Sequence, residues 1–217
     1  MEWEKETGNK TERTRLRILN AAVKLFDAQG YDGTTVRQIA EAADVNLALI
    51  SYHFQGKQGL LEVLIATYYE KFFQLLEGEF AGSAHTTALE QLQQMIRLYV
   101  FFQRDHAAVT RLVQRELSVE SMLAREVMTV YIHRWKHGFA SVIEQGMISK
   151  EFETGPIDPI ILAMTSLLVY PYQNPQTVRE VYYLEPNSDA FCEWLISSVI
   201  QLVTSLLVPI ESQACNR

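Results

Sequence analysis

The sequence contains few glycines, prolines and cysteines. Ten glycines and six prolines among 217 residues make up about 7% of the chain, against roughly 12% in average usage, which argues against loop-rich, collagen-like and low-complexity folds. The two cysteines, Cys192 and Cys215, have no cysteine close by in the sequence, so neither a disulfide framework nor a cysteine-rich zinc site is available and a reducing cytosol is indicated. The sequence also lacks strand-like alternation, glycine-rich loops and internal repeats. A helical protein of one or two domains is therefore predicted.

Long apolar runs are also scarce. Residues 1–10 alternate acid and base, so we expect a flexible N-terminus and no signal peptide. The most apolar segment, Trp194–Ile210, is 17 residues long and is bracketed by Glu193 and Glu211, whereas a spanning helix needs about 20 apolar residues with basic flanks. We predict a buried or dimer-interface helix here, no membrane insertion, and a cytoplasmic protein.

Charge is unevenly distributed along the chain. The net charge is −7, yet residues 1–60 carry eight Lys or Arg and eight Asp or Glu, so the whole excess lies in residues 61–217. An acidic body would discourage non-specific wrapping of DNA and would leave any contact to a small patch on the head. The alternative is that a difference of this size is chance.

The first 60 residues have the pattern of a helix-turn-helix unit. Residues 9–29 are predicted to form a helix with an apolar stripe on one face. Thr34 or Thr35 then caps a second, short helix, and residues 44–46 make a tight turn into a third helix that ends at Phe54. Two short helices joined by a three-residue turn, after a longer support helix, are the parts of a helix-turn-helix.

The rest of the chain is predicted to be helical as well, which gives an all-α protein of about nine helices. Residues 82–85 are the first plausible boundary. Thr87 and Glu90 have capping-box spacing, and Asp158 and Pro159 have the pattern of an N-cap and first helical residue. A break is expected at residues 171–175. The predicted helices of this part are 57–80, 87–104, 107–117, 119–145, 159–170 and 189–208, with a short turn of helix at 177–183.

One string of residues in the head carries a family resemblance. It comprises Ile18-Leu-Asn-Ala-Ala22, Leu25-Phe26, Gly30-Tyr31, Thr34-Thr-Val-Arg-Gln-Ile-Ala40, Ala43, Val45, Ile50, Tyr52-His-Phe54, Lys57 and Leu60. These residues resemble the N-terminal DNA-binding domain of the TetR family. The resemblance implies a DNA-binding domain over residues 11–60 and a helical dimerisation and regulatory domain over 61–217.

The third helix would be the recognition helix. Its spacing predicts that Val45, Ile50 and Phe54 pack inward. The outward residues are then Leu47, Ala48, Leu49, Ser51 and Tyr52. The aliphatic side chains of this unusually apolar face can touch a thymine methyl group, while the two hydroxyls form hydrogen bonds. The family often has tyrosine where Ser51 stands, and Tyr52 is the expected replacement for its phosphate contact.

Further DNA contacts are expected around this helix. The resemblance places Arg37 where it reaches a base edge, and a guanidinium can pair bidentately with guanine; the alternative is an exposed arginine bonded to Glu41. Thr35 and Lys57 suit phosphate anchoring, and Thr35 can act at the same time as a helix cap. We expect His53 to be a packing or phosphate-side residue more than a base reader.

Arg13 and Arg17 on the first helix are expected either to add contacts to the DNA backbone or to form a solvated face.

The last two long helices, 159–170 and 189–208, are the most apolar. The resemblance implies that two copies pair through a four-helix bundle of such helices. A wide apolar stripe on a monomer would also be a liability, so a homodimer is predicted on physical grounds. Two recognition helices would then lie about one DNA turn (~34–36 Å) or more apart and would bind a roughly palindromic site.

Aromatic residues in the body are candidates for a small-molecule effector pocket, with simple core packing as the alternative. They are Tyr99, Phe101, Phe102, His106, Trp135 and His137. His133 and His137 have metal-ligand spacing, with Glu144 further along, but no third adjacent ligand accompanies them, so no metal is predicted. We find no nucleophile and base motif, phosphate loop or cofactor motif, and therefore predict no enzyme and no cofactor.

Four segments of the body carry a finer resemblance, within the same family, to a protein of spore-forming bacilli that binds chromosomal sites near the replication origin and acts on the division protein FtsZ. They are Arg111–Glu116, Arg125–Met128, Pro171–Pro175 and Arg179–Pro186. This resemblance implies a nucleoid-associated role in septum placement and in chromosome capture during sporulation. The expected partner surface is the mixed-charge patch of Arg111, Arg115, Glu116, Glu120, Arg125 and Glu126.

Overall fold

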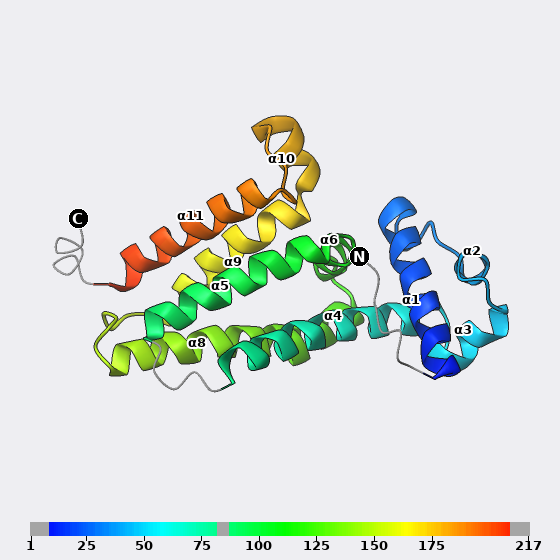
Figure 1. Ribbon diagram of the computed structural model, residues 1–217, viewed down its shortest axis with the longest axis horizontal. Coiled ribbons are helices and arrows are strands. Elements are labelled where there is room, and N and C mark those ends of the chain that lie inside the picture. The colour runs from blue at the N-terminus through cyan, green and yellow to red at the C-terminus, as the bar shows by residue number, and fades with distance from the viewer. Residues whose placement is uncertain (1–8, 82–86, 209–217) are drawn as a thin grey trace.

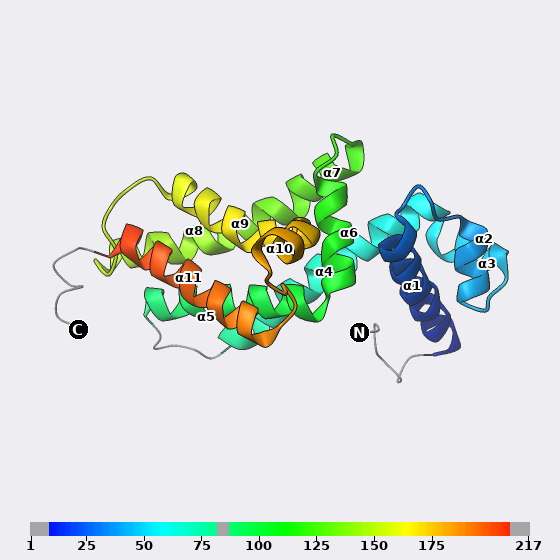
Figure 2. The same cartoon turned by 90° about the horizontal axis from the view of Figure 1, so that it is seen from above.

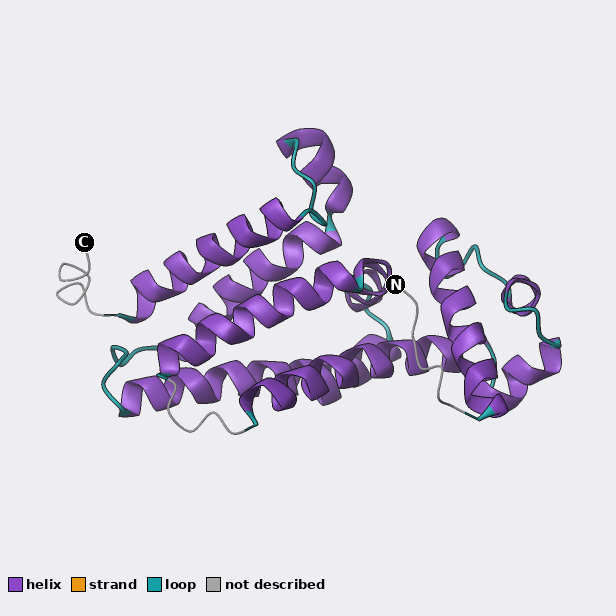
Figure 3. Cartoon of the chain, viewed as in Figure 1, coloured by secondary structure: helices purple, strands orange, loops and turns teal. Residues whose placement is uncertain are grey.

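The computed structural model describes residues 9–81 and 87–208, and within these ranges every regular element is helical (Figure 1, Figure 3). The elements are α1 (Lys10–Gln29), α2 (Val36–Ala42), α3 (Leu47–Phe54), α4 (Lys57–Phe80), α5 (Ala88–Asp105), α6 (Ala107–Leu117), α7 (Met122–Val127), the π-helical turn η1 (Met128–Ile132), α8 (His133–Ile148), α9 (Ile157–Gln173), α10 (Pro175–Tyr182) and α11 (Asp189–Leu207). Since α7, η1 and α8 are continuous, the described ranges hold ten helical runs where about nine were predicted. The predicted all-α fold is confirmed. The predicted boundary at 82–85, Cys215 and all but the end of the N-terminal segment 1–10 lie outside the described residues.

Helices α1, α2 and α3, with the start of α4, form a small head at one end of the molecule (Figure 1). Ile18, Phe26, Ile39, Ile50 and Leu60 are fully buried in its core, as the predicted apolar stripes require. Helices of seven and eight residues, such as α2 and α3, are unstable alone because helix nucleation is unfavourable. They therefore depend on this packing. The 24 residues of α4 continue from the head into the body.

The body is a bundle of long helices around an aromatic core. Helix α5 packs against α8 and α11, α9 packs against α6, α8 and α11, and α6 crosses the long helices beside the head (Figure 2). Tyr68, Phe72, Tyr99, Phe102 and Trp135 are all buried. Their rings meet at centroid separations of 4.9 Å to 5.5 Å, in the range of favourable aromatic pairs. These rings thus form one aromatic cluster within a body core that also contains many aliphatic side chains.

The predicted helix 119–145 begins later and ends later than expected. Ser121 is its N-cap, since its hydroxyl accepts the Ala124 N–H at 3.0 Å, and the helix runs from Met122 to Ile148. It contains the π-helical turn η1, which inserts one extra residue into the hydrogen-bond ladder. Apolar periodicity did not locate the start because Val119 is exposed rather than part of the buried stripe.

Two predictions about α9 are wrong. The helix begins at Ile157 with Pro156 as N-cap, so Asp158 is in the first turn and not at the cap. Pro171 does not end the helix, which continues to Gln173. A proline there removes one N–H donor, and because Pro171 lies in the last turn only that one bond of the helix end is lost. The buried amide of Gln103 also contacts this part of α9, by donating to the Leu168 carbonyl at 3.1 Å.

Helix α11 is long and apolar enough to cross a membrane by length and composition, and 39% of its most apolar window is buried inside the molecule. Its buried residues, among them Cys192, Leu195 and Val199, face α5 and α9. On its other side Trp194 and Leu206 are exposed. One side of α11 is thus a core face and the other is an apolar surface.

Candidate nucleic-acid interface

The turn between α2 and α3 is built by backbone hydrogen bonds around Asp44. Asp44 has a φ of 50°, a left-handed conformation that Asp and Asn tolerate better than most residues. The Val45 N–H donates to the Ala40 carbonyl at 3.0 Å and the Asp44 N–H donates to the Glu41 carbonyl at 3.1 Å. This pair of bonds is a Schellman motif. It satisfies the end of α2 and turns the chain directly into α3.

Arg17 stabilises this turn from α1. Its Nε donates to the Ala43 carbonyl at 3.0 Å, and its Nη2 bonds the carbonyls of Ala43 and Asp44 and lies 3.3 Å from the Asp44 carboxylate. Neither expectation for Arg17, a DNA-backbone contact or a solvated face, describes this arrangement. Sequence spacing could not reveal the role because the acceptors are 26 and 27 residues away.

The N-terminus of α2 carries a complete capping box. The Thr35 hydroxyl accepts the Gln38 N–H at 3.2 Å, and the Gln38 side chain accepts the Thr35 N–H at 2.8 Å, which confirms the predicted cap. Arg37, in the first turn, is exposed. Within residues 9–81 and 87–208 it forms no hydrogen bond or ion pair, so the alternative pairing with Glu41 is not formed. Its guanidinium faces solvent.

The outer face of α3 matches most of the prediction. Ile50 and Phe54 are buried and Val45 packs against the core. The residues exposed on this face are Leu47, Ala48, Ser51 and Tyr52. Asn46 fixes the start of the helix by accepting the Ala48 N–H at 2.8 Å.

Leu49 and His53 lie at the edge of this face. Leu49 is half-buried and packs against the head core, so its prediction as an outward residue is wrong. Its position on the helix falls between the exposed and buried sides, and apolar contact with the core draws it inward. His53 is half-buried as well, with its ring edge-on to Tyr52 at 4.9 Å. That placement agrees with the expected packing role.

Lys57 is bound inside the head. Its Nζ donates to the carbonyls of Tyr31 at 2.9 Å and Thr34 at 3.0 Å and lies 4.2 Å from the centroid of the Tyr31 ring. Two N–H groups are thus used to hold the α1–α2 loop against the start of α4. Only the third N–H of the Lys57 ammonium group remains for the predicted phosphate contact.

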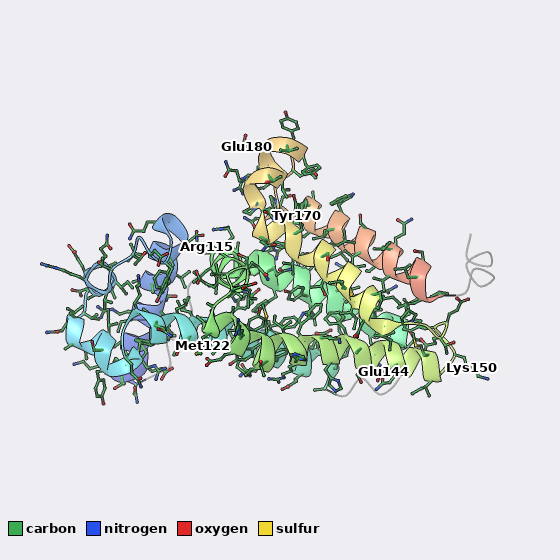
Figure 4. All side chains as sticks on the ribbon, turned by 180° about the vertical axis from the view of Figure 1, so that it is seen from behind. Arg115, Met122, Glu144, Lys150, Tyr170 and Glu180 are labelled. Carbon is green, nitrogen blue, oxygen red and sulfur yellow. The ribbon has the colours of Figure 1, made fainter. Side chains whose placement is uncertain are left out.

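The head is joined to the body through α1 and α6 as well as through α4. The Arg111 guanidinium forms a bidentate ion pair with the Asp27 carboxylate, in which Nε donates to Oδ1 at 2.9 Å and Nη2 donates to Oδ2 at 2.6 Å. Arg115 donates to the Phe26 carbonyl at 3.2 Å, and Figure 4 shows it beside α1. The predicted partner surface is therefore divided: Arg111 and Arg115 serve this joint, whereas Arg125 and Glu126 are exposed.

The predicted effector-pocket residues do not line one cavity. Phe102 and His106 border a hollow of about 360 Å³ beside α4, whereas Trp135 and His137 border another of about 180 Å³. Tyr99 is buried, and Phe101 packs under the Arg104 guanidinium at 4.6 Å. Of these six residues, Tyr99, Phe102 and Trp135 are core residues, as the alternative of core packing expects, whereas Phe101 and His106 are half-buried and His137 is exposed.

Polar atoms are nevertheless buried in the body core. The Tyr69 hydroxyl, Gln103 Oε1 and Trp135 Nε1 are buried and lack a hydrogen-bond partner among the described residues. Burial raises the pKa of the Tyr69 and Tyr99 phenols, so both are neutral at physiological pH. In the described part of the chain no three His, Cys, Asp or Glu side chains gather as metal ligands.

Comparison with known proteins agrees with this geometry. The family model for bacterial regulatory proteins of the tetR family matches residues 18–64, which span the helix-turn-helix and the start of α4. The probable HTH-type transcriptional regulator YttP of Bacillus subtilis is 40% identical over 178 residues, which are 82% of this chain and 86% of YttP.

Solved structures share the whole fold. A tetR-family regulatory protein from Rhodococcus RHA1 superposes with a TM-score of 0.72 at 23% identity, covering 90% of this chain and 98% of its own. A transcriptional regulator from Saccharomonospora viridis, solved in complex with choline, superposes with a TM-score of 0.74 at 19% identity, over 91% of this chain and 99% of its own. On the helix-turn-helix geometry and the match to YttP, the chain belongs to the TetR family, whose members are dimeric DNA-binding transcriptional regulators and not enzymes.

Proposed function

We propose that two copies of this chain pair through α9 and α11 and bind a palindromic DNA site with α3 and Arg37. The observation that carries the proposal is the exposed face of α3, which lies beside the exposed Arg37 side chain of α2. Arg37 supplies the free guanidinium for a guanine, while Thr35, at the exposed start of α2, and Tyr52 contact phosphate. Domain limits of 11–60 for the head and 61–217 for the body are part of this proposal.

The DNA-binding part is tested with full-length protein and a site selected from random duplexes. Arg37→Ala is expected to lower affinity for that site about ten- to hundred-fold, with little change on unrelated DNA. Tyr52→Ala is expected to weaken binding to both. Arg179→Ala, in the body helix α10, is the matched control. Equal affinity of the wild type for all sequences would overturn the proposal.

The apolar surface of α9 and α11 supports the pairing. Leu162, Tyr170, Trp194 and Leu206 are exposed there, with Leu162 69% and Trp194 56% accessible. An apolar hollow of about 400 Å³ opens beside them between α9, α10 and α11, and Figure 4 shows Tyr170 at the foot of α10. Exposed apolar area of this extent is rare on a monomer.

Pairing is tested by the mass of the protein in solution. The double variant Leu162→Glu, Trp194→Glu is expected to be a folded monomer, since it buries charge in the interface and not in the core. Ile148→Glu, a change of the same kind at the exposed end of α8, should remain a dimer. A dimeric double variant would contradict this interface.

For regulation, we propose a small-molecule effector held in the body. The buried, unpartnered Tyr69 hydroxyl and Trp135 Nε1 support it, because buried polar groups usually have a partner. The Saccharomonospora viridis regulator, which has this fold, was solved in complex with a small molecule, choline. A compound that raises the melting temperature and releases DNA, with both effects lost in Trp135→Phe, is the expected result.

A second candidate function is to mark a position on the chromosome and act there on cell division. The segments Arg111–Glu116, Arg125–Met128, Pro171–Pro175 and Arg179–Pro186 resemble RefZ, the TetR-type protein described above that acts on FtsZ. The exposed Arg125 and Glu126 would remain as the partner surface. Genome-wide mapping of bound DNA distinguishes this function from that of an effector-regulated repressor. Several palindromic sites around the replication origin, away from promoters, favour the nucleoid-associated role in cell division. A single site over a neighbouring promoter favours an ordinary repressor.

A further inference from the structure

The exposed face of α3 contains neither a charged nor an amide side chain. Helix α3 reads Leu-Ala-Leu-Ile-Ser-Tyr-His-Phe, without Lys, Arg, Asn, Gln, Asp or Glu. Its exposed members are Leu47, Ala48, Ser51 and Tyr52. At roughly 100° per residue these four lie within one arc of about 140° on the helix surface, and the buried Ile50 and Phe54 lie outside that arc. The side most suited to enter a major groove is therefore aliphatic at its start and hydroxylic further along.

Each base pair demands a particular chemistry from its reader. Guanine is read by Arg or Lys and adenine by the amides of Asn or Gln, whereas the C5-methyl group of thymine is read by apolar contact. In a helix-turn-helix the N-terminal residues of the recognition helix contact the base edges. In α3 these are Leu47, which is 48% exposed, and Ala48.

We propose that α3 reads thymine methyl groups, with Leu47 and Ala48 packed on the methyls of neighbouring A·T pairs in each half-site. This inference rests on the proposed DNA binding and names the chemistry by which the site is read. Ser51 and Tyr52 contribute hydroxyls alongside the two apolar readers. The guanidinium of Arg37, from α2, reads a single G·C pair at the border of the A·T pairs.

The amide side chains on either side of α3 do not supply the base-reading groups that the helix itself lacks. The Asn46 side chain is committed to the Ala48 N–H at 2.8 Å. Gln55 follows the helix at its C-cap, in a left-handed conformation with φ 60°, at the end away from the base-reading residues. The cations Arg17 and Lys57 are held by backbone carbonyls. Apolar contact thus has an unusually large share in the specificity of this head.

The experiment removes methyl groups from the DNA one at a time. Full-length protein selects its site from random duplexes, and each thymine of that site is then replaced by deoxyuridine, which pairs identically and lacks only the methyl. At two neighbouring positions in each half-site the affinity is expected to fall about four-fold per methyl. Uracil at the outer positions of the site should have no effect.

A protein variant assigns the contact. In Leu47→Ala the affinity should fall and the uracil effect should vanish at one of these positions. Leu75→Ala, at an exposed leucine of α4 in the body, should keep the full uracil effect. Ala48→Gly provides the same comparison for the second position.

The outcomes separate the inference from the function beneath it. A selected site in which no thymine is sensitive to uracil, or in which G·C pairs fill the centre of each half-site, overturns the thymine readout and leaves sequence-specific binding intact. Failure to select any sequence overturns both.

Discussion

The head and the body are held together by different kinds of contact. In the head, short helices are fixed by single cations that reach backbone carbonyls from distant parts of the chain, Arg17 to Ala43 and Lys57 to Tyr31 and Thr34. In the body, long helices are fixed by buried rings over a wide area. The head therefore adds a few long-range polar bonds to its small apolar core, whereas the body spreads its stability over many apolar contacts. Arg17 and Lys57 are thus engaged in holding the head together.

The largest effect is expected at Gly59, where the head meets α4. A Cβ atom at this position would lie 2.0 Å from the Phe54 carbonyl oxygen and 3.1 Å from its carbon. Since the obstacle is backbone, Gly59→Ala must displace the end of α3. We expect a loss of about 3 kcal/mol of unfolding free energy in urea and loss of specific DNA binding.

Gly78, near the other end of the same helix, is the matched control. A Cβ there has no atom within 4 Å, so Gly78→Ala is expected to stabilise the protein by up to about 1 kcal/mol through helix propensity. Similar effects of the two substitutions would show that the head is not the more fragile region.

A smaller effect is expected at Lys57. Lys57→Met removes two hydrogen bonds from an ammonium group and leaves the Tyr31 and Thr34 carbonyls without them, which should cost about 2 kcal/mol in denaturant unfolding. If the lysine acts inside the head, the slope of log affinity against log salt stays unchanged. A decrease in that slope of about 1 would instead establish the phosphate contact predicted from sequence.

The joint between the two regions should contribute less. The side chains of Arg111 and Asp27 are each about a third exposed, so solvent screens their ion pair, and Asp27→Asn is expected to cost about 1 kcal/mol. A double-mutant cycle with Arg111→Gln measures the coupling between them. Arg97→Gln, which breaks an ion pair within the body, should leave DNA affinity unchanged, whereas the joint variants should alter it.

The smallest effect concerns pH. Burial lowers the pKa of His106, so the unfolded chain binds its proton more readily than the folded chain. Stability is then complete above the ordinary histidine pKa of about 6.5 and falls as the pH drops through that value. Between pH 7.5 and 5.5 we expect His106 to account for a fall in melting temperature of at most about 2 °C, which His106→Gln should remove. An unchanged fall in that variant would assign it to other groups.

Local signals predicted the helices well and distant contacts poorly. The capping box at Thr87 and the cap at Thr34 or Thr35 marked helix starts, and the structure places the latter at Thr35, because a cap involves residues only three positions apart. Pro171 was assigned to a break, yet the helix continues to Gln173, because a proline in the last turn costs the helix only one N–H donor.

In the candidate site, too, the features set by local sequence could be predicted and those set by distant contacts could not. Helical periodicity predicted the exposure of Leu47, Ala48, Ser51 and Tyr52. The same prediction was wrong for Leu49, because this residue lies at the boundary between the exposed and buried faces of α3. The internal roles of Arg17 and Lys57 could not be predicted, because their acceptor carbonyls lie 23 to 27 residues away in sequence.

Helix α4 begins in the head and ends in the body as one rod of 24 residues, which is about 36 Å long. Such a rod acts as a lever arm: a tilt of only ~5° at its body end displaces its head end by ~3 Å, close to the ~3.4 Å between successive bases of a DNA strand. Two such levers in a dimer would set the spacing of the reading heads in steps of a base pair. An angular change too small to disturb the aromatic core is then enough to move both heads out of register with the site.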